Sequence, residues 1–143
     1  MHLETFTKRL AGLTSDNQDF NYHIGESLDS GTFQSIEQKL DIVFPAKVKD
    51  FLSAVNGLQT HNPAFEILDL NELRVEGNLI QFAIFDETIQ ICFKVDKYNN
   101  AGEWTIIEKE TKFEITQTIA SFWSNKIWHW LEKRHEIWKD NWW

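Results

Sequence analysis

The stretch "LIQFAIFDETIQICFKV", residues 79–95, decides the fold class. Apolar residues, mainly Ile, Phe and Val, recur through both halves of it and are interrupted by the acidic pair Asp86-Glu87. This composition and this alternation are typical of β-strands. The stretch therefore predicts two neighbouring antiparallel strands, 79–85 and 88–95, joined by a hairpin whose turn contains about two residues.

Further strands are expected on both sides of this hairpin. The run "FEILDL" at 65–70 precedes it, "EWTIIEK" at 103–109 follows it, and a last short strand is expected near residues 113–115. The connections between these runs are too short for helical crossovers, so we expect an antiparallel, meandering sheet.

Amphipathic helices are predicted at the two ends of the chain. The first dozen residues repeat apolar side chains at steps of three and four, which predicts a helix ending near Gly12. Residues 14–32 are polar and are predicted to form a long loop, held down by Phe20, Tyr22 and Ile24. A long helix with apolar residues at helical spacing is predicted from Thr116 through Trp138.

The segment "IEQKLDIVFPAKVKDFLSAVNGL", residues 36–58, predicts two short helices. The first should begin around Thr32 or Ser35, because a hydroxyl can cap its first turn. The second should begin at Pro45, whose fixed backbone angle suits a first helical position, and end at Asn56-Gly57, which tolerate left-handed angles. Its buried side chains should be Val48, Phe51, Leu52 and Val55.

This order of parts resembles the SUKH superfamily, which includes the yeast cell-wall-synthesis regulator and many bacterial immunity proteins. The resemblance covers about residues 33–131 and departs from the family at Phe85-Asp86-Glu87, where members often have Phe-Gly, and at Leu58, where a second glycine is common. The matching positions are Glu37, Leu40, Phe44-Pro45, Phe51-Leu52, Asn56-Gly57 and Ser121-Phe122.

The resemblance implies a single α+β domain, residues 1–143, in which an antiparallel β-meander packs against N-terminal helices and a long C-terminal helix. It also implies an immunity role in the bacterial cytoplasm: stoichiometric binding of a cognate secreted toxin, with no catalysis and no cofactor. The alternative is a cytosolic regulatory or scaffolding module, similar to the yeast regulator.

The charge of the chain favours a basic protein partner. It carries 14 Lys and Arg against 22 Asp and Glu, a formal charge of −8, which repels the phosphate backbone of nucleic acids and would attract a basic toxin such as a nuclease. No apolar run approaches the length of a membrane span. The acidic residues predicted to bind the partner are Glu72, Glu76, Asp86, Glu87 and Asp96.

Tryptophan is unusually frequent near the C-terminus, where six of the seven residues lie from Trp123 onward. Trp128 falls well round the helix from the apolar stripe, so it or the terminal pair Trp142-Trp143 could contact a partner or a second copy in a homodimer. The alternative is a tail that folds back over its own core. Trp104 is a further candidate for partner contact, with core packing as its alternative.

Residues that could carry catalysis or bind metal are sparse. Cys92 lies within a predicted strand and is expected to be a buried structural thiol. His129, Glu132 and Glu136 share one face of the predicted helix, but no second cluster supplies the remaining ligands of a metal site; the alternative is a solvated face with ion pairs to Lys133, Arg134 or Lys139. No nucleotide-binding or hydrolase motif is present, so we expect neither a metal nor an enzyme.

Overall fold

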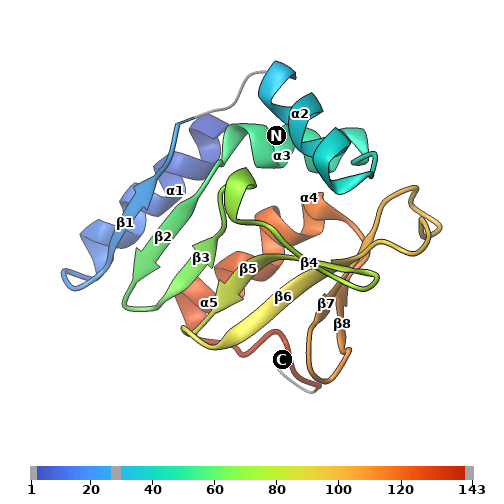
Figure 1. The fold of residues 1–143 in the computed structure, drawn as a ribbon. Coiled ribbons are helices and arrows are strands. Elements are labelled where there is room, and N and C mark those ends of the chain that lie inside the picture. Colours follow the sequence, from blue (N-terminus) through green and yellow to red (C-terminus); the bar gives the residue numbers. More distant parts are fainter. Residues whose placement is uncertain (1–2, 27–29, 141–143) are drawn as a thin grey trace.

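The computed structural model describes residues 3–26 and 30–140, which fold around an eight-stranded antiparallel sheet (Figure 1). The strand order is β1-β2-β3-β5-β6-β7-β8, and β4 pairs with β5 off this path. The predicted α+β class and the antiparallel meander are confirmed. The strands are β1 Asn21–Ile24, β2 Leu58–His61, β3 Phe65–Ile67, β4 Arg74–Glu76, β5 Leu79–Phe85, β6 Ile89–Lys94, β7 Thr105–Glu108 and β8 Glu114–Thr116.

The predicted central hairpin is strands β5 and β6. Their register runs from Leu79 opposite Lys94 to Phe85 opposite Ile89, so three residues, 86–88, form the turn. Asp86 and Glu87 adopt positive φ angles of 52° and 67° in this turn. These are the backbone angles that a tight hairpin turn requires, although glycine and asparagine usually provide them.

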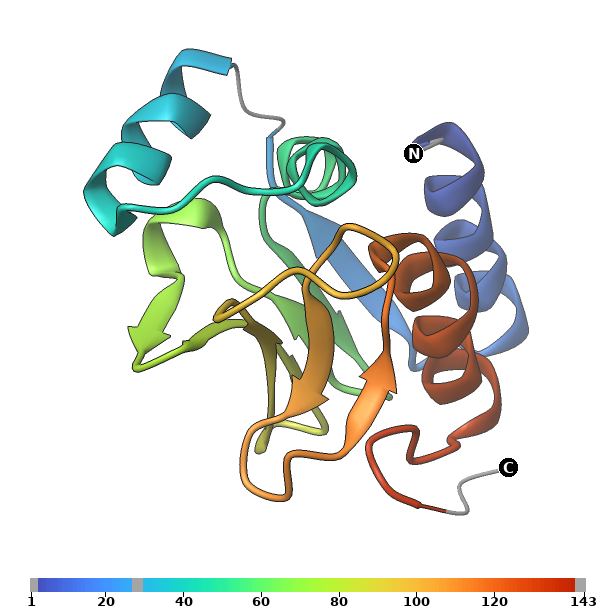
Figure 2. The ribbon, with the colours of Figure 1, turned by 90° about the vertical axis from the view of Figure 1, so that its right-hand side faces the viewer.

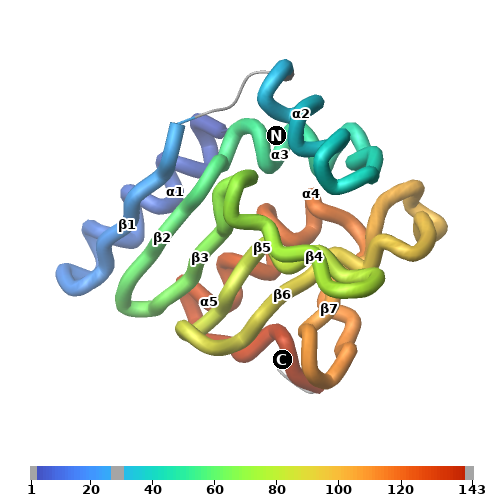
Figure 3. The backbone as a smooth tube through the Cα atoms, viewed as in Figure 1, coloured from blue at the N-terminus to red at the C-terminus, as the bar shows by residue number. Residues whose placement is uncertain are grey.

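One edge of β5 pairs with two short strands in succession. β3 pairs with its C-terminal half, and β4 pairs with its N-terminal half, where Arg74 lies opposite Gln81. The 3-10 turn η1, Leu70–Glu72, connects the two, as the chain path in Figure 3 shows. The register of β5 with β6 shifts between Gln81 and Ala83, a bulge of the kind that bends a strand locally.

The prediction of an unbroken loop over residues 14–32 is wrong. Residues 21–24 form β1, which pairs with β2 from Asn21 opposite His61 to Ile24 opposite Leu58. Backbone pairing to a strand distant in sequence satisfies these peptide groups, so four residues of a largely polar stretch become an edge strand. The predicted anchoring of this segment is correct, since Phe20 is buried and Tyr22 and Ile24 pack against the core.

Helices α1 and α5 lie on one side of the sheet, whereas α2 and α3 lie over one end of it (Figure 2). α1 runs four residues past its predicted end at Gly12, because nothing at that exposed glycine interrupts the helix. α3 begins one residue later than predicted, because Pro45 has a non-helical ψ of 144° and is the N-cap rather than the first helical residue; Gly57 beyond its end has φ +87°. The helix bounds are α1 Leu3–Asp16, α2 Ser30–Leu40, α3 Ala46–Ala54, α4 Ile119–Ser121, the π-helical turn η2 Phe122–Lys126 and α5 Ile127–Lys133.

The C-terminal helix is shorter than predicted, running from Ile119 to Lys133 rather than from Thr116 to Trp138. It ends where Arg134 adopts a left-handed conformation with φ 60°. The following residues turn back, and Trp138 packs against Phe85 and Trp130 with ring centroids 5.3 and 5.1 Å apart. No helix within residues 3–26 and 30–140 combines the length and the apolar character needed to cross a membrane.

Candidate functional site

Figure 2 shows the face of the sheet away from α1 and α5. This face carries a row of accessible side chains. Successive residues of a strand point to opposite faces, so the strand positions between buried core residues point outward. The register aligns Gln59 of β2, Glu66 of β3, Ile84 of β5 and Gln90 of β6 in one row. None of these four residues is buried. We call this surface the outer face.

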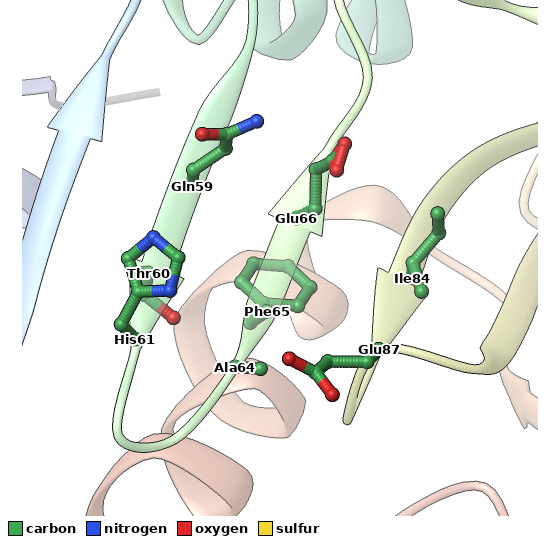
Figure 4. Close-up of a pocket in the computed structure, with 8 residues that line it drawn as sticks. All are labelled: Gln59, Thr60, His61, Ala64, Phe65, Glu66, Ile84 and Glu87. Atoms are coloured by element: carbon green, nitrogen blue, oxygen red, sulfur yellow. The ribbon is translucent and has the colours of Figure 1, made fainter.

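A pocket of about 300 Å³ opens on the outer face, beside the β5–β6 turn (Figure 4). Thr60 and Phe65 are its buried residues, whereas His61 and Glu87 are exposed. Figure 4 shows the Glu87 carboxylate directed from the turn toward β3. The lining residues are Gln59, Thr60, His61, Ala64, Phe65, Glu66, Ile84 and Glu87.

Carboxylates give this pocket its charge. Glu66 and Glu87 line it, and Asp86 lies next to Glu87 in the same turn. Within the described part of the chain, no ion pair involves any of these three acids. The nearby Arg134 instead donates a hydrogen bond to the backbone oxygen of Asn62, at 3.1 Å. Solvated carboxylates of this kind are available to Lys and Arg side chains of a partner.

The structure separates the acidic residues that the sequence predicted to bind the partner. Asp86 and Glu87 lie at the turn of the β5–β6 hairpin, whereas Glu76 and Asp96 lie at its other end, roughly 20 Å away for strands of this length. Glu72 is the last residue of the η1 turn. It does not line the pocket and lies outside the hairpin. Glu76 forms an ion pair with Lys109 at 2.6 Å, and this contact lowers the pKa of Glu76.

Trp104 packs in the core, which is the alternative considered for it. Its side chain is 3% exposed. Its ring centroid lies 5.3 Å from that of Phe44 and 5.8 Å from that of Phe93, and Tyr98 stacks on it. Partner contact through Trp104 would require it to leave these neighbours.

The prediction that Trp128 lies away from the buried stripe is wrong, since it is 3% exposed. The Ile127 N–H bonds to the Phe122 oxygen, five residues back, and this π turn rotates the following residues by about 100° relative to a regular helix. Trp128 is thereby turned toward α1, where its ring lies 5.3 Å from Phe6 and beneath the Arg9 guanidinium. Trp142 and Trp143 lie outside the described residues.

The helical face considered for metal binding does not form. Glu132 binds Arg9 through two hydrogen bonds of 2.6 and 3.0 Å, and Glu136 pairs with Lys139 beyond the end of α5. The ring of His129 stacks on that of His135. Burial lowers the pKa of His129, as do the charges of Lys133, His135 and Lys126. No group of three His, Cys, Asp or Glu residues suited to a metal occurs in the part of the chain that the structure describes.

Cys92 is buried, as predicted, but on the outer face rather than in the main core. It packs in a small cluster with Leu79 and Ile107, and its residue is 1% exposed. Burial raises the pKa of the Cys92 thiol to about 11. A thiol with this pKa is protonated at neutral pH and is a poor nucleophile.

The raised pKa of Cys92 predicts a loss of stability at alkaline pH. The folded state keeps the proton up to about pH 11, whereas the unfolded chain releases it near the ordinary value of 9.0. The contribution of the protonated Cys92 thiol to stability is therefore complete below pH 9. The free energy of unfolding then falls by about 2 kcal/mol as the pH rises to 11. Urea unfolding of the natural chain and of Cys92→Ala at pH 8 and pH 11 measures this difference. An equal pH dependence in both proteins would contradict it.

The sequence did not reveal the strand β2, which supplies Gln59 and His61 to the pocket. Residues 58–61, "LQTH", have the burial pattern of a half-buried strand, with Leu58 and Thr60 inside and the other two residues outside. Four residues are too few for this alternation to be recognised without its partner strands.

The chain matches no protein-family model and no curated protein.

Proposed function

We propose that this protein is a SUKH-type immunity protein, which binds a basic protein toxin and blocks it without catalysing a reaction. The observation that carries the proposal is the outer face, where Glu66 and Glu87 line a pocket beside Asp86, and none of these three acids forms an ion pair with another described residue. Such carboxylates accelerate association with a basic partner and pair with its Lys and Arg residues.

The arrangement of the elements that resemble SUKH proteins supports the same proposal. Glu37, the acidic residue of that pattern, accepts a hydrogen bond from the Phe44 backbone N–H at 2.8 Å and lies 3.2 Å from the Lys49 ammonium. It therefore ties α2 to the start of α3. Phe51 and Leu52, also in the pattern, are buried in the core. These residues build the scaffold and leave the outer face to the partner.

A growth experiment tests the proposal directly. The product of the neighbouring gene is expressed in a sensitive host, with and without this protein, and surviving cells are counted. Immunity predicts killing that this protein prevents. An active toxin that kills equally in its presence would reject the proposal, and a harmless neighbour would favour the regulatory or scaffolding role.

Charge reversal on the outer face tests which surface binds. With a toxin identified by the growth experiment, Glu66→Lys/Glu87→Lys is expected to lower the association rate at least tenfold at low salt, because two attractive charges become repulsive. The matched control is Glu72→Lys/Asp96→Lys, which makes the same change of charge at exposed residues away from the pocket. Stopped-flow association rates measure the effect. Equal rates for the two variants would exclude this pocket from the interface.

A further inference from the structure

A second pocket, of about 190 Å³, opens on the outer face near the N-terminal end of β5. It is separate from the acidic pocket beside the β5–β6 turn, and the two share no lining residue. Strands β4, β5 and β6 supply most of its wall, because Gln81 lies between Arg74 of β4 and Cys92 of β6 in the register. Gln90 and Lys109 also line this pocket.

The amide nitrogen of Gln81 in this pocket is buried without a hydrogen bond to any residue that the structure describes. The residue is 4% exposed. Buried polar groups in native proteins are almost always paired, because an unpaired donor loses its bonds to water and gains nothing in exchange. An unpaired amide that lines a pocket is therefore well placed to donate to the acceptor oxygen of a ligand.

Two cationic side chains at the pocket favour a ligand whose hydrogen-bond acceptor is negatively charged. Arg74 and Lys109 both line the pocket, and Glu76 pairs with Lys109 at 2.6 Å. Arg74 has no ion pair with another described residue. The Cys92 thiol adds no negative charge at neutral pH, because its pKa is raised to about 11. The lining residues thus carry two positive charges and one negative charge, with a free hydrogen-bond donor beneath them.

We propose that this pocket binds a carboxylate group, with Gln81 Nε2 donating to one oxygen and Arg74 balancing the charge. Guanidinium and amide groups donate hydrogen bonds in directions that suit the two oxygens of a planar carboxylate. The volume of about 190 Å³ is below that of pockets for drug-sized ligands, so it suits a carboxyl group with a few carbon atoms. This inference does not depend on the proposed immunity function.

Titration of the ¹⁵N-labelled full chain, followed by NMR at constant ionic strength, tests the proposal. The probes are sodium acetate, a blocked Gly-Glu-Gly peptide and sodium phosphate, with sodium chloride as the reference. We expect saturable shifts of the Gln81 side-chain amide signals with acetate, with the peptide, or with both. Tighter binding of the peptide would identify the acidic side chain of a protein partner as the source of the carboxylate, and tighter binding of acetate would identify a small free acid.

Variants distinguish binding in the pocket from weak surface attraction. Gln81→Met removes the amide at similar size, and Arg74→Gln removes the charge at an exposed position. For these two variants the backbone amides of residues 81 and 92 report binding, and each variant is expected to lower the affinity at least tenfold. Gln59→Met, elsewhere on the outer face, should leave it unchanged. Unchanged affinity in Gln81→Met and Arg74→Gln, shifts that do not saturate, or equally tight binding of phosphate would overturn the proposal.

Discussion

Replacing Phe122 with alanine is expected to lower the free energy of unfolding by about 3–5 kcal/mol. Phe122 is fully buried at the start of the π turn in the C-terminal helix. Its ring centroid lies 6.5, 5.4 and 6.1 Å from those of Phe65, Phe82 and Phe85, so it joins the helix to two strands of the sheet. Truncation to alanine leaves a cavity between these rings, which the rigid sheet cannot fill.

Urea unfolding followed by circular dichroism measures this loss. Phe113→Ala is the control, because it removes the same side chain from a half-buried position near the β7–β8 turn. It is expected to cost less than half as much, since part of the Phe113 ring is already in water. Similar losses for the two variants would show that Phe122 does not link the helix to the sheet as described.

Replacing Glu103 with alanine is expected to lower the free energy of unfolding by about 2–3 kcal/mol. Glu103 is 4% exposed, and its Oε1 atom accepts a hydrogen bond of 2.9 Å from the backbone N–H of Ile119. Ile119 is the first residue of α4, so this carboxylate satisfies an N–H group that the helix itself leaves unpaired. Its negative charge also lies at the positive end of the helix dipole. Alanine would leave this donor buried and unpaired.

Glu103→Gln separates the hydrogen bond from the charge. Glutamine keeps an acceptor oxygen at the same position, so we expect it to retain more than half of the stability that alanine loses. Hydrogen exchange at the Ile119 amide gives a local measure, since the amide should exchange faster in Glu103→Ala than in Glu103→Gln. Equal exchange rates and equal stabilities in the two variants would contradict this role.

The predictions that held depend on neighbours close in sequence. The β5–β6 hairpin, the start of α3 within one residue of Pro45 and the burial of Cys92 follow from residues within a few positions of each other. Two of the predictions that failed depended on distant segments. β1 forms because β2 pairs with it, and the Glu132 carboxylate binds Arg9, which is 123 residues away.

The candidate site shows the same division. The sequence identified Asp86 and Glu87 at the hairpin turn, but it did not reveal Glu66 or Gln81 as site residues, because their roles come from alignment across strands. It predicted partner contact for Glu76 and Asp96 as well as for the turn residues, although the hairpin holds these two at its opposite end. The order of charged residues along the chain does not show which end of a strand lies beside which pocket.

The sequence by itself determined the α+β class, the antiparallel meander and the acidic charge of the surface, because local periodicity, turn chemistry and composition are properties of neighbouring residues. Only the tertiary structure decided that Trp128 is buried, since one π turn and the packing of α1 together reset which side of the helix faces inward. It also decided which carboxylates and which unpaired amide share the outer face. These outcomes depend on contacts between segments far apart in the chain, which no local pattern encodes.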